Sequence, residues 1–261
     1  MPDVAIVTGA SGGIGAAICS NLGSEGLDLV AQYRNGAERA DQVAKQLRGQ
    51  GATCHLVQAD LATMSGVQGV IDRVADLLLK DPTARVRALV NNAGRLLSPS
   101  FDEIAPDVFD EYVAVNTKAP LFLAQGLSKM MAPGAAIVNI SSASAHIASA
   151  GDMVYAMTKS AIESLTRNMA EALAPRGIRV NAVVPGFTAN GHPAFADESA
   201  VAYMGSLSML GGVADPRHVA DAVSFLLSDR AARTTGALLD VTGGMTLHPR
   251  PHRASSVRDL L

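Results

Sequence analysis

Aromatic residues and cysteines are scarce in this chain. It has no tryptophan, four tyrosines and six phenylalanines among 261 residues, and its two cysteines are Cys19 and Cys54. Two cysteines are too few for a disulfide framework and are typical of a reducing compartment. No apolar run approaches the roughly 18 residues that span a bilayer. No basic segment precedes the short apolar run at the N-terminus, so we expect no signal peptide. These absences predict a soluble, cytoplasmic protein with no membrane partner.

A strong charge of either sign is also missing. The formal net charge is -3, which gives no reason to expect nucleic acid as a partner. Hydrophobic residues make up 48% of the chain, too many for a disordered protein. A length of 261 residues without a break in composition fits one large domain.

Short apolar runs rich in Val, Ile and Ala recur along the chain and predict strands. They cover residues 4–7, 27–31, 54–59, 87–91, 135–140, 178–184 and 237–241. Most are separated by segments with helical periodicity, for example 36–51. This alternation predicts an α/β domain over 1–247, with a doubly wound parallel sheet of seven strands and helices on both faces. The tail at 248–261 has two prolines and several basic residues. We expect it to be loose or packed on a partner, rather than to bind metal through His248 and His252.

A glycine-rich turn follows the first predicted strand. In "TGASGGIG", residues 8–15, Gly9, Gly13 and Gly15 lie between a strand and a helix. Glycine lets the main chain approach a ligand closely, and the N-terminus of the next helix attracts a pyrophosphate. The spacing G-x-x-x-G-x-G differs from the common G-x-G-x-x-G fingerprint. A tight turn without a ligand is the alternative, but the position in the first βαβ unit favours a dinucleotide.

Polar segments follow three later strands. Asp60 comes after the third strand, "NNAG" at 91–94 after the fourth, and "VPGFT" at 184–188 after the sixth. Ligands in open α/β sheets bind outside the carboxyl ends of the strands. We therefore expect these segments to converge on one crevice, where Asp60 would accept a hydrogen bond from an adenine amino group.

A tyrosine and a lysine stand four residues apart in "YAMTK". Residues i and i+4 of a helix share a face, so Tyr155 and Lys159 are expected to point the same way. Taken alone, such a pair is more often a surface tyrosine lying over a lysine stem.

The motifs together resemble the short-chain dehydrogenase/reductase family. "TGASGGIG", "NNAG", "NISS", "YAMTK" and "VPG" occur in the family's order, from Val4 to about Leu247, and the overall likeness is greatest to the 3-oxoacyl-[acyl-carrier-protein] reductase branch. The resemblance implies a Rossmann fold, a nicotinamide cofactor and carbonyl/alcohol redox chemistry. It implies the catalytic residues Asn116, Ser142, Tyr155 and Lys159, with Ser142 preferred over Ser141 by the family's usual distance to the tyrosine. It implies that the cofactor is bound by Gly9, Ser11, Gly13, Ile14, Gly15, Arg34, Asn35, Asp60, Leu61, Asn91, Ala93, Gly94, Tyr155, Lys159, Pro185, Gly186 and Thr188, with no metal.

The paired side chains suit ketone reduction on physical grounds. Tyr155 can supply a proton to the carbonyl oxygen, but a free phenol has a pKa of about 10. A cation about 4 Å away, at an effective dielectric near 20, is worth roughly 4 kcal/mol, or up to ~3 pKa units. We therefore expect Lys159 to bring Tyr155 near neutrality. Ser142 would hydrogen-bond the substrate oxygen, and Asn116 would hold a water that links Lys159 to solvent.

The end of the second strand predicts NADPH rather than NADH. Enzymes of this fold that prefer NAD usually have an acid there, which repels a 2′-phosphate. Here Gln32 takes about that place, and Arg34 can fork two hydrogen bonds to a phosphate while Asn35 adds a neutral one. An ordinary solvated Arg34 is the alternative. Gly12, where some NADP-dependent relatives have a basic residue, argues in the other direction.

The sequence does not identify the substrate. A carbonyl reductase is expected, acting on a 3-oxoacyl thioester held by a carrier protein or on a free secondary-metabolite or steroid-like ketone. Basic residues for an acidic carrier protein would be Lys129, Arg176 and Arg179. An NAD-dependent alcohol dehydrogenase of the family and a non-catalytic nucleotide-binding regulator are the alternatives. The close spacing of Tyr155 and Lys159 disfavours an enoyl reductase.

The resemblance also implies a mobile substrate lid at 188–212 and a homodimer or homotetramer. The helix that holds Asn116 and the helix at 152–174 would pack across subunits. Three positions depart from the common family pattern: Asn190, Gly212 and His218. Asn190 leaves one nicotinamide or phosphate contact in question, and we expect the other two to alter the surface or subunit packing.

Overall fold

A parallel sheet of seven strands forms the centre of the molecule, as shown by a computed structural model that describes residues 2–96 and 99–247. The strand order is β3-β2-β1-β4-β5-β6-β7, and all six neighbouring pairs are parallel. The strands are β1 (Asp3–Val7), β2 (Asp28–Tyr33), β3 (Cys54–Gln58), β4 (Arg85–Asn91), β5 (Met131–Ile140), β6 (Arg179–Pro185) and β7 (Leu238–Val241). The predicted doubly wound α/β fold is confirmed.

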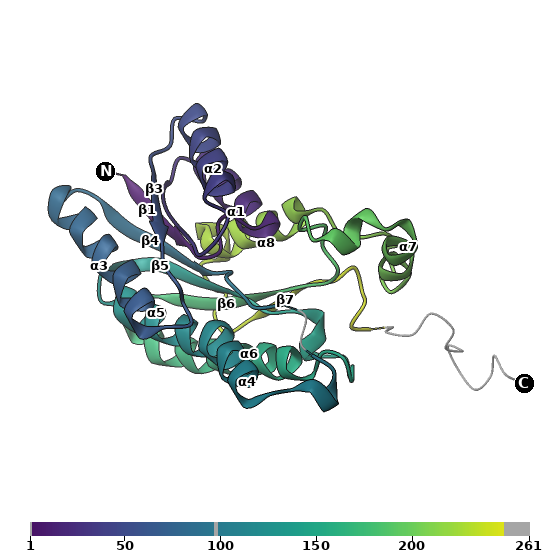
Figure 1. The fold of residues 1–261 in the computed structure, drawn as a ribbon. Coiled ribbons are helices and arrows are strands. Elements are labelled where there is room, and N and C mark those ends of the chain that lie inside the picture. Colours follow the sequence, from purple (N-terminus) through teal and green to yellow (C-terminus); the bar gives the residue numbers. More distant parts are fainter. Residues whose placement is uncertain (1, 97–98, 248–261) are drawn as a thin grey trace, which may run out of the picture.

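Helices cover both faces of this sheet. They are α1 (Gly13–Ser24), α2 (Ala37–Gly49), α3 (Met64–Lys80), α4 (Pro106–Val113), α5 (Ala119–Ser128), α6 (Met153–Leu173), α7 (Glu198–Ser206) and α8 (Pro216–Leu227). Figure 1 shows α1, α2 and α8 on one face and α3, α4, α5 and α6 on the other, while α7 stands away from the sheet.

The continuous apolar runs of the strands reflect burial on both faces. Successive side chains of a strand point to opposite faces. Val4 and Ile6 accordingly join the core under α3 and α5, whereas Ala5 and Val7 join the core under α1 and α8. Each core is closed by helices with an apolar stripe, and neither face of the central strands reaches solvent.

The chain reverses its direction along the sheet at β1. Strands β2 and β3 lie on one side of β1 and β4 to β7 on the other, so the carboxyl ends of β1 and β4 flank a topological switch point. This is where open α/β sheets bind their ligands. The glycine loop follows β1 and the "NNAG" segment follows β4, so both lie at this point.

The described residues contain no helix that is both long and apolar enough to cross a membrane. Within residues 2–96 and 99–247, no group of three or more His, Cys, Asp or Glu side chains is arranged to hold a metal ion. The expected loose tail at 248–261, with His248 and His252, lies outside the described residues.

Candidate active site

The glycine loop forms a cradle at the carboxyl end of β1. Gly9 has a φ of 68°, in the left-handed region that favours glycine. A side-chain carbon at Gly15 would lie 2.2 Å from the Gly9 carbonyl oxygen, and one at Gly13 would lie 2.7 Å from the main chain of Asn190. Ile14, the second residue of α1, is partly buried against the core. The loop therefore tolerates no side chains at these glycines, and the N-terminus of α1 opens directly behind it.

Asn92 fixes this loop, although the sequence analysis did not single it out. Its Nδ2 donates to the carbonyl oxygens of Thr8 (2.8 Å) and Gly9 (3.2 Å). The N–H groups of Asn92 and Ala93 both donate to the Thr8 hydroxyl at 3.0 Å. The "NNAG" motif contained the signal, because a side-chain amide that follows β4 can reach the loop after the adjacent β1.

The side chain of Asn91 is committed to the sheet. Its side chain is buried, and its Nδ2 donates to Oδ1 of Asn139 on the neighbouring strand at 2.8 Å. Its own Oδ1 has no hydrogen-bond partner in the described part of the chain. The Asn91 side chain therefore links β4 to β5 within the sheet.

The prediction that Gln32 takes the place of the ribose-binding acid is wrong. Gln32 is buried, and its side chain accepts from the Gly9 N–H at 3.0 Å and donates to the Ala59 carbonyl at 2.7 Å. Side chains alternate along the strand, so the exposed end of β2 belongs to Tyr33, which is its last residue. The conclusion drawn from Gln32 survives, because tyrosine is not an acid either.

Arg34, the predicted phosphate ligand, is the first residue after β2. Its Nη1 lies 3.5 Å from Oε1 of Glu111 and 3.9 Å from Oδ1 of Asp60, and its side chain is 46% exposed. Asn35 is joined to the glycine loop, since the Ser11 hydroxyl donates to its carbonyl at 3.0 Å. Arg34 and Asn35 therefore lie beside the loop, with Arg34 facing two carboxylates.

The remaining predicted cofactor contacts also lie at the carboxyl ends of the strands. Asp60 accepts from the Ala62 N–H at 3.0 Å and keeps a half-exposed carboxylate, while Leu61 is buried. Beyond β6, which ends at Pro185, a side-chain carbon at Gly186 would lie 3.0 Å from the main chain of Thr242. Buried Thr188 donates to the Gly186 carbonyl at 3.0 Å.

Tyr155 and Lys159 lie on one face of α6, as predicted. The Lys159 Nζ is 5.5 Å from the centre of the Tyr155 ring and donates to the Ile140 carbonyl at the end of β5 at 2.7 Å. Lys159 is only 4% exposed. A side-chain carbon at Gly94 would lie 3.6 Å from both Lys159 Nζ and Asn116 Oδ1. The "NNAG" segment after β4 and the end of β5 therefore both lie next to Lys159.

The two adjacent serines face different partners. Ser142 lies close enough to Tyr155 to lower the pKa of its phenol, and the Ser142 Oγ accepts from the Ser144 N–H at 3.2 Å. Buried Ser141 instead donates to Oε1 of Glu163 at 2.6 Å. Only Ser142 lies at the tyrosine hydroxyl, in agreement with the choice made from spacing.

Asn116 lies in a π turn rather than in one continuous helix. Residues 114–118 form this turn between α4 and α5. Both hydrogens of the Asn116 amide are engaged, by the Arg95 carbonyl (3.1 Å) and the Thr158 hydroxyl (3.0 Å), and its Oδ1 accepts from the Arg95 N–H at 2.7 Å. The side chain therefore has no hydrogen left to donate to the expected water. A π turn is instead a recurrent feature of functional sites, because it shifts the main-chain pairing of a helix.

The electrostatics of the pair differ from the expectation. Burial raises the pKa of Tyr155 to about 12, although the hydrogen bond from Ser142 acts in the opposite direction. Burial also lowers the pKa of Lys159 to about 8. The lysine thus does not bring the tyrosine near neutrality in the protein alone. Its ammonium faces the ring and the Ile140 carbonyl, and desolvation disfavours both charged forms.

Comparisons with known proteins identify the family of this chain. The family model described as Enoyl-(Acyl carrier protein) reductase matches residues 9–246. The 3-oxoacyl-[acyl-carrier-protein] reductase of Staphylococcus aureus is 30% identical over 247 residues, which cover 94% of this chain and 98% of that protein. This chain belongs to the short-chain dehydrogenase/reductase family. Membership makes it an oxidoreductase that depends on NAD(P).

Two solved structures of dehydrogenase/reductases are similar over nearly the whole chain. The angucycline C-6 ketoreductase LanV with bound NADP has a TM-score of 0.90 and 36% identity, and the match covers 94% of this chain and 96% of that one. A short-chain dehydrogenase from Burkholderia cenocepacia in complex with NADP has a TM-score of 0.87 and 32% identity, covering 93% and 97%.

The segment at 188–212 of this dehydrogenase/reductase was predicted to form a substrate lid. Its two ends lie side by side in the structure. Thr188 pairs with Ala214 in a parallel bridge, and the Ala214 N–H donates to the Phe187 carbonyl at 2.9 Å. Helix α7 lies between these ends and stands away from the sheet (Figure 1). Gly212 has a φ of 72°, so the arginine of many relatives would be strained there.

The three basic residues considered for carrier-protein docking lie far from Tyr155 within one copy of this dehydrogenase/reductase. Lys129 precedes β5, Arg176 precedes β6 and Arg179 begins β6, so all three lie at the amino ends of the strands. Arg179 is also buried and donates to the Leu226 carbonyl at the end of α8. Arg176 is hydrogen-bonded to Ser128. Arg176 is exposed, but it lies at the opposite edge of the sheet from Tyr155.

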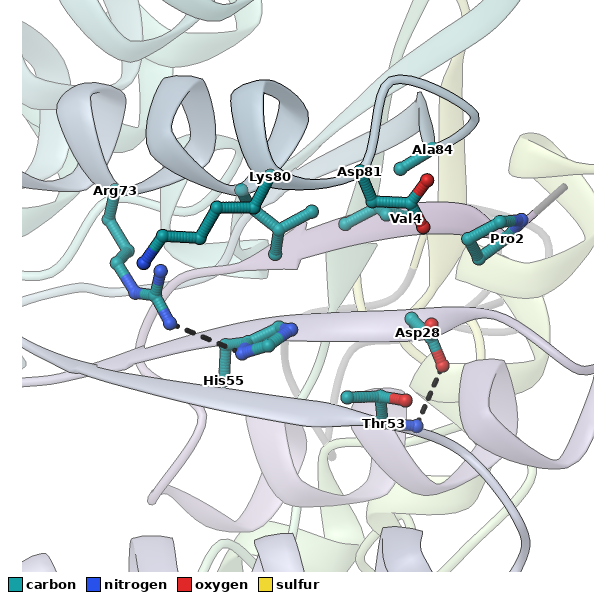
Figure 2. Close-up of a pocket in the computed structure, with 10 residues that line it drawn as sticks. Pro2, Val4, Asp28, Thr53, His55, Arg73, Lys80, Asp81 and Ala84 are labelled. Carbon is teal, nitrogen blue, oxygen red and sulfur yellow. Dashed lines mark hydrogen bonds between the residues drawn. The ribbon is translucent and has the colours of Figure 1, made fainter.

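A separate hollow of about 370 Å³ lies near the amino ends of β1 and β2, away from the predicted site of this dehydrogenase/reductase. Figure 2 shows Arg73 and Lys80 of α3 above His55, with a hydrogen-bond distance of 3.2 Å between Arg73 Nη2 and His55 Nδ1. Burial and the nearby Arg73 lower the pKa of His55. None of the predicted catalytic or cofactor-binding residues lines this hollow.

Proposed function

We propose that this protein is an NADPH-dependent reductase that transfers a hydride to the carbon of a ketone, with Tyr155 as the proton donor. The observation that carries the proposal is the placement of Tyr155 next to Ser142, with Lys159 one helical turn further along the same face. These groups stand at the carboxyl ends of β4 and β5, next to the glycine loop, which is where a hydride donor and a carbonyl would meet.

The residues present fit a dinucleotide. The cradle at Gly9, Gly13 and Gly15 accepts a group where a side chain would clash, and the N-terminus of α1 favours negative charge there. Asp60 and Leu61 suit the adenine end, and Thr188 suits the nicotinamide end. When bound, a reduced nicotinamide supplies the hydride, and the protein supplies orientation and the proton.

The side chains divide the remaining chemistry among them. Ser142 holds the substrate oxygen, and the Tyr155 hydroxyl donates a proton to it as negative charge develops. Lys159, whose pKa is lowered to about 8 by burial, is poised to exchange protons near neutral pH. Asn116 keeps the π turn and the main chain of Arg95 in register beside Lys159.

The preference for NADPH over NADH rests on charge. No acid ends β2, and Arg34 with Asn35 can bind a 2′-phosphate. The two solved relatives described above hold NADP. An NAD-dependent alcohol dehydrogenase of the same family is the alternative, and a direct comparison of the two cofactors decides between them.

We favour a free ketone over a carrier-bound thioester as substrate. The ketoreductase LanV, named for an angucycline, is 36% identical to this chain, whereas the S. aureus 3-oxoacyl-[acyl-carrier-protein] reductase is 30% identical. The positions of Arg176 and Arg179 give no support to carrier docking within one copy. The family model is named for enoyl reductases, but the four-residue spacing of Tyr155 and Lys159 suits a ketone.

The test is NADPH oxidation by the purified protein against a panel of carbonyl compounds. The panel should hold polycyclic aromatic ketones, 3-oxosteroids, an acetoacetyl thioester of a small thiol and the same acyl group on a carrier protein. Turnover of a free ketone supports the proposal. Turnover of the carrier-bound substrate alone overturns the substrate class. NADPH binding without oxidation by any compound favours the non-catalytic regulator.

A further inference from the structure

A buried carboxylate lies directly behind the proposed active site. Glu163 of α6 is one helical turn beyond Lys159, and its side chain is 8% exposed. Its Oε1 accepts a hydrogen bond from Ser141 Oγ at 2.6 Å and lies 2.9 Å from Nε2 of His146. Burying a carboxylate is unfavourable unless it is hydrogen-bonded, so these two contacts are what keep it there.

The two partners of Glu163 flank the proposed catalytic serine. Ser141 precedes Ser142 directly, and His146 follows it after the short 3-10 turn Ala143–Ala145. One oxygen atom thus ties both ends of the segment 141–146 to α6, the helix that holds Tyr155 and Lys159. Ser141 Oγ also lies 3.3 Å from the Lys159 carbonyl oxygen, which brings the same segment against the main chain of the lysine.

The other side of the segment is packed against apolar groups. Ala143 and Ile147 contact Leu207, beyond α7, and Met245, beyond β7. Asp240 of β7 lies on the same side, near His146. Apolar contact with the predicted lid therefore holds one side of the segment. On the other side Glu163 is joined by Asp152, which accepts from Ser144 Oγ at 2.6 Å, and by Ser160, which donates to the Ala145 carbonyl at 3.3 Å.

We propose that Glu163 is a positioning residue, which fixes the Ser142 hydroxyl against Tyr155 by holding Ser141 and His146. This inference rests on the proposed function of Ser142 and Tyr155. Glu163 takes no part in proton transfer, since its contacts end at Ser141 and His146. Its contribution is to orientation, where a misplacement of about 1 Å can reduce turnover roughly 100-fold.

The first test does not depend on turnover. Hydrogen–deuterium exchange is compared between the wild type and Glu163→Ala, and the readout is the amides of residues 144–146. Those of Ala145 and His146 are bonded to the Ser142 and Ala143 carbonyls, and that of Ser144 to the Ser142 hydroxyl. We expect roughly tenfold faster exchange there, with the amides of α6 unchanged. Unchanged exchange in 144–146 would overturn the proposal, whatever the enzyme reduces.

The second test is a double-mutant cycle with Ser142→Ala, using the best ketone of the panel. Glu163→Ala should lower kcat by roughly 10- to 100-fold and leave the dissociation constant of NADPH within about twofold. In the Ser142→Ala background it should have no further effect beyond about twofold, because both changes act through one hydroxyl. If the two substitutions together lowered kcat by the product of their separate factors, Glu163 would act independently of Ser142, and the proposal would be overturned.

Matched variants guard against a general loss of structure. Glu171→Ala changes an exposed glutamate of the same helix and should leave both readouts unchanged. Glu163→Gln keeps an acceptor for Ser141 and should recover most of the activity lost in Glu163→Ala. If Glu163→Ala does not fold, Ser141→Ala takes its place. It should lower kcat several-fold and should also lose its effect in the Ser142→Ala background. Failure of the wild type to reduce any ketone would count against the proposed function alone, and the exchange test would still decide this inference.

Discussion

The guanidinium of Arg34 faces the carboxylate of Glu111 at 3.5 Å, across the crevice from the end of β2 to α4. Glu111 also pairs with Arg95, which follows the "NNAG" segment. The group proposed to bind a 2′-phosphate is therefore already engaged by an acid of the protein. A phosphate that binds Arg34 must compete with this carboxylate.

Arg34→Ala should remove most of the preference for NADPH. A charge-assisted hydrogen bond is worth about 1.5–3 kcal/mol, so wild-type kcat/KM should favour NADPH by roughly 10- to 100-fold. The variant should have a lower kcat/KM with NADPH, while its kcat/KM with NADH should be nearly unchanged. Steady-state kinetics with both cofactors measure this, and Arg48→Ala, an exposed arginine at the end of α2, is the control. Equal use of both cofactors by the wild type would contradict the assignment.

Glu111→Gln should act in the opposite direction. Without the charge of Glu111, nothing competes with the phosphate for Arg34. Since surface ion pairs are worth up to about 1 kcal/mol, NADPH should bind roughly 2- to 5-fold more tightly. NADH, which has no 2′-phosphate, should be unaffected. Titration by the fluorescence of the bound reduced cofactor gives both dissociation constants. A similar gain for NADH would mean that Glu111 affects the adenosine site in general rather than Arg34.

Tyr155→Phe should abolish most turnover while the protein still binds NADPH. The ring remains, and only the hydroxyl next to Ser142 is lost. Proton transfer by a positioned group contributes about 10²–10⁴-fold, which is the expected loss in kcat. If the variant kept half of the wild-type rate on the best ketone, Tyr155 would not be the proton donor.

Lys159→Met should inactivate the enzyme and yet stabilise the fold near neutral pH. The folded pKa of about 8 lies below the ordinary value of 10.5, so the charged lysine opposes folding below pH 8. This penalty fades as the pH rises from 8 to 10.5, and at about 1.4 kcal/mol per pKa unit it is on the order of 3 kcal/mol. The loss of the hydrogen bond to Ile140 offsets part of the gain.

Urea unfolding of the wild type and Lys159→Met at pH 7 and pH 10 measures this effect. The variant should be more stable at pH 7 by roughly 1–2 kcal/mol, and the difference should shrink at pH 10. Higher pH is unsuitable, because Tyr155, with its pKa raised to about 12, itself loses stabilising power as the pH rises from 10 to 12. Destabilisation by the same amount at both pH values would return Lys159 to a purely structural role.

The protein should assemble as a dimer or tetramer through α4 and α6. Phe109 on α4 and Met153 and Met157 on α6 are exposed in a single copy, at 38%, 43% and 41%. Phe109→Asp should shift the mass seen by light scattering towards the monomer. Leu79→Asp, which changes a 79% exposed residue of α3, should not. A monomeric wild type would contradict this prediction.

The sequence predicted the fold correctly, and the structure brings the predicted site residues to one edge of the sheet, because both follow from local patterns. Apolar runs mark buried parallel strands, and a polar motif after each strand must lie at the same edge of the sheet. It was less informative on which way a side chain points at the end of a strand. Gln32 was misplaced by one position, and since side chains alternate along β2, the exposed end belongs to Tyr33.

The sequence could not predict properties that depend on burial or on partners far along the chain. The proximity of Tyr155 and Lys159 followed from helical spacing, but their pKa values follow from desolvation by segments far along the chain. The π turn at 114–118 was read as plain helix, because its apolar pattern continues through the turn. Glu163 gave no signal either, since its partners Ser141 and His146 come from another segment.

The pairing of Thr188 with Ala214 makes residues 189–213 a closed excursion whose two ends meet at one point. Changes of length inside such an excursion do not alter the distance between its ends, and each doubling of loop length costs only about 0.6 kcal/mol. Inside the excursion, Leu207 packs against Ala143 and Asn190 lies against Gly13, so these two positions must be kept when its length changes. Exchanging this stretch for that of another ketoreductase offers a modular route to new substrate range, in evolution as in engineering.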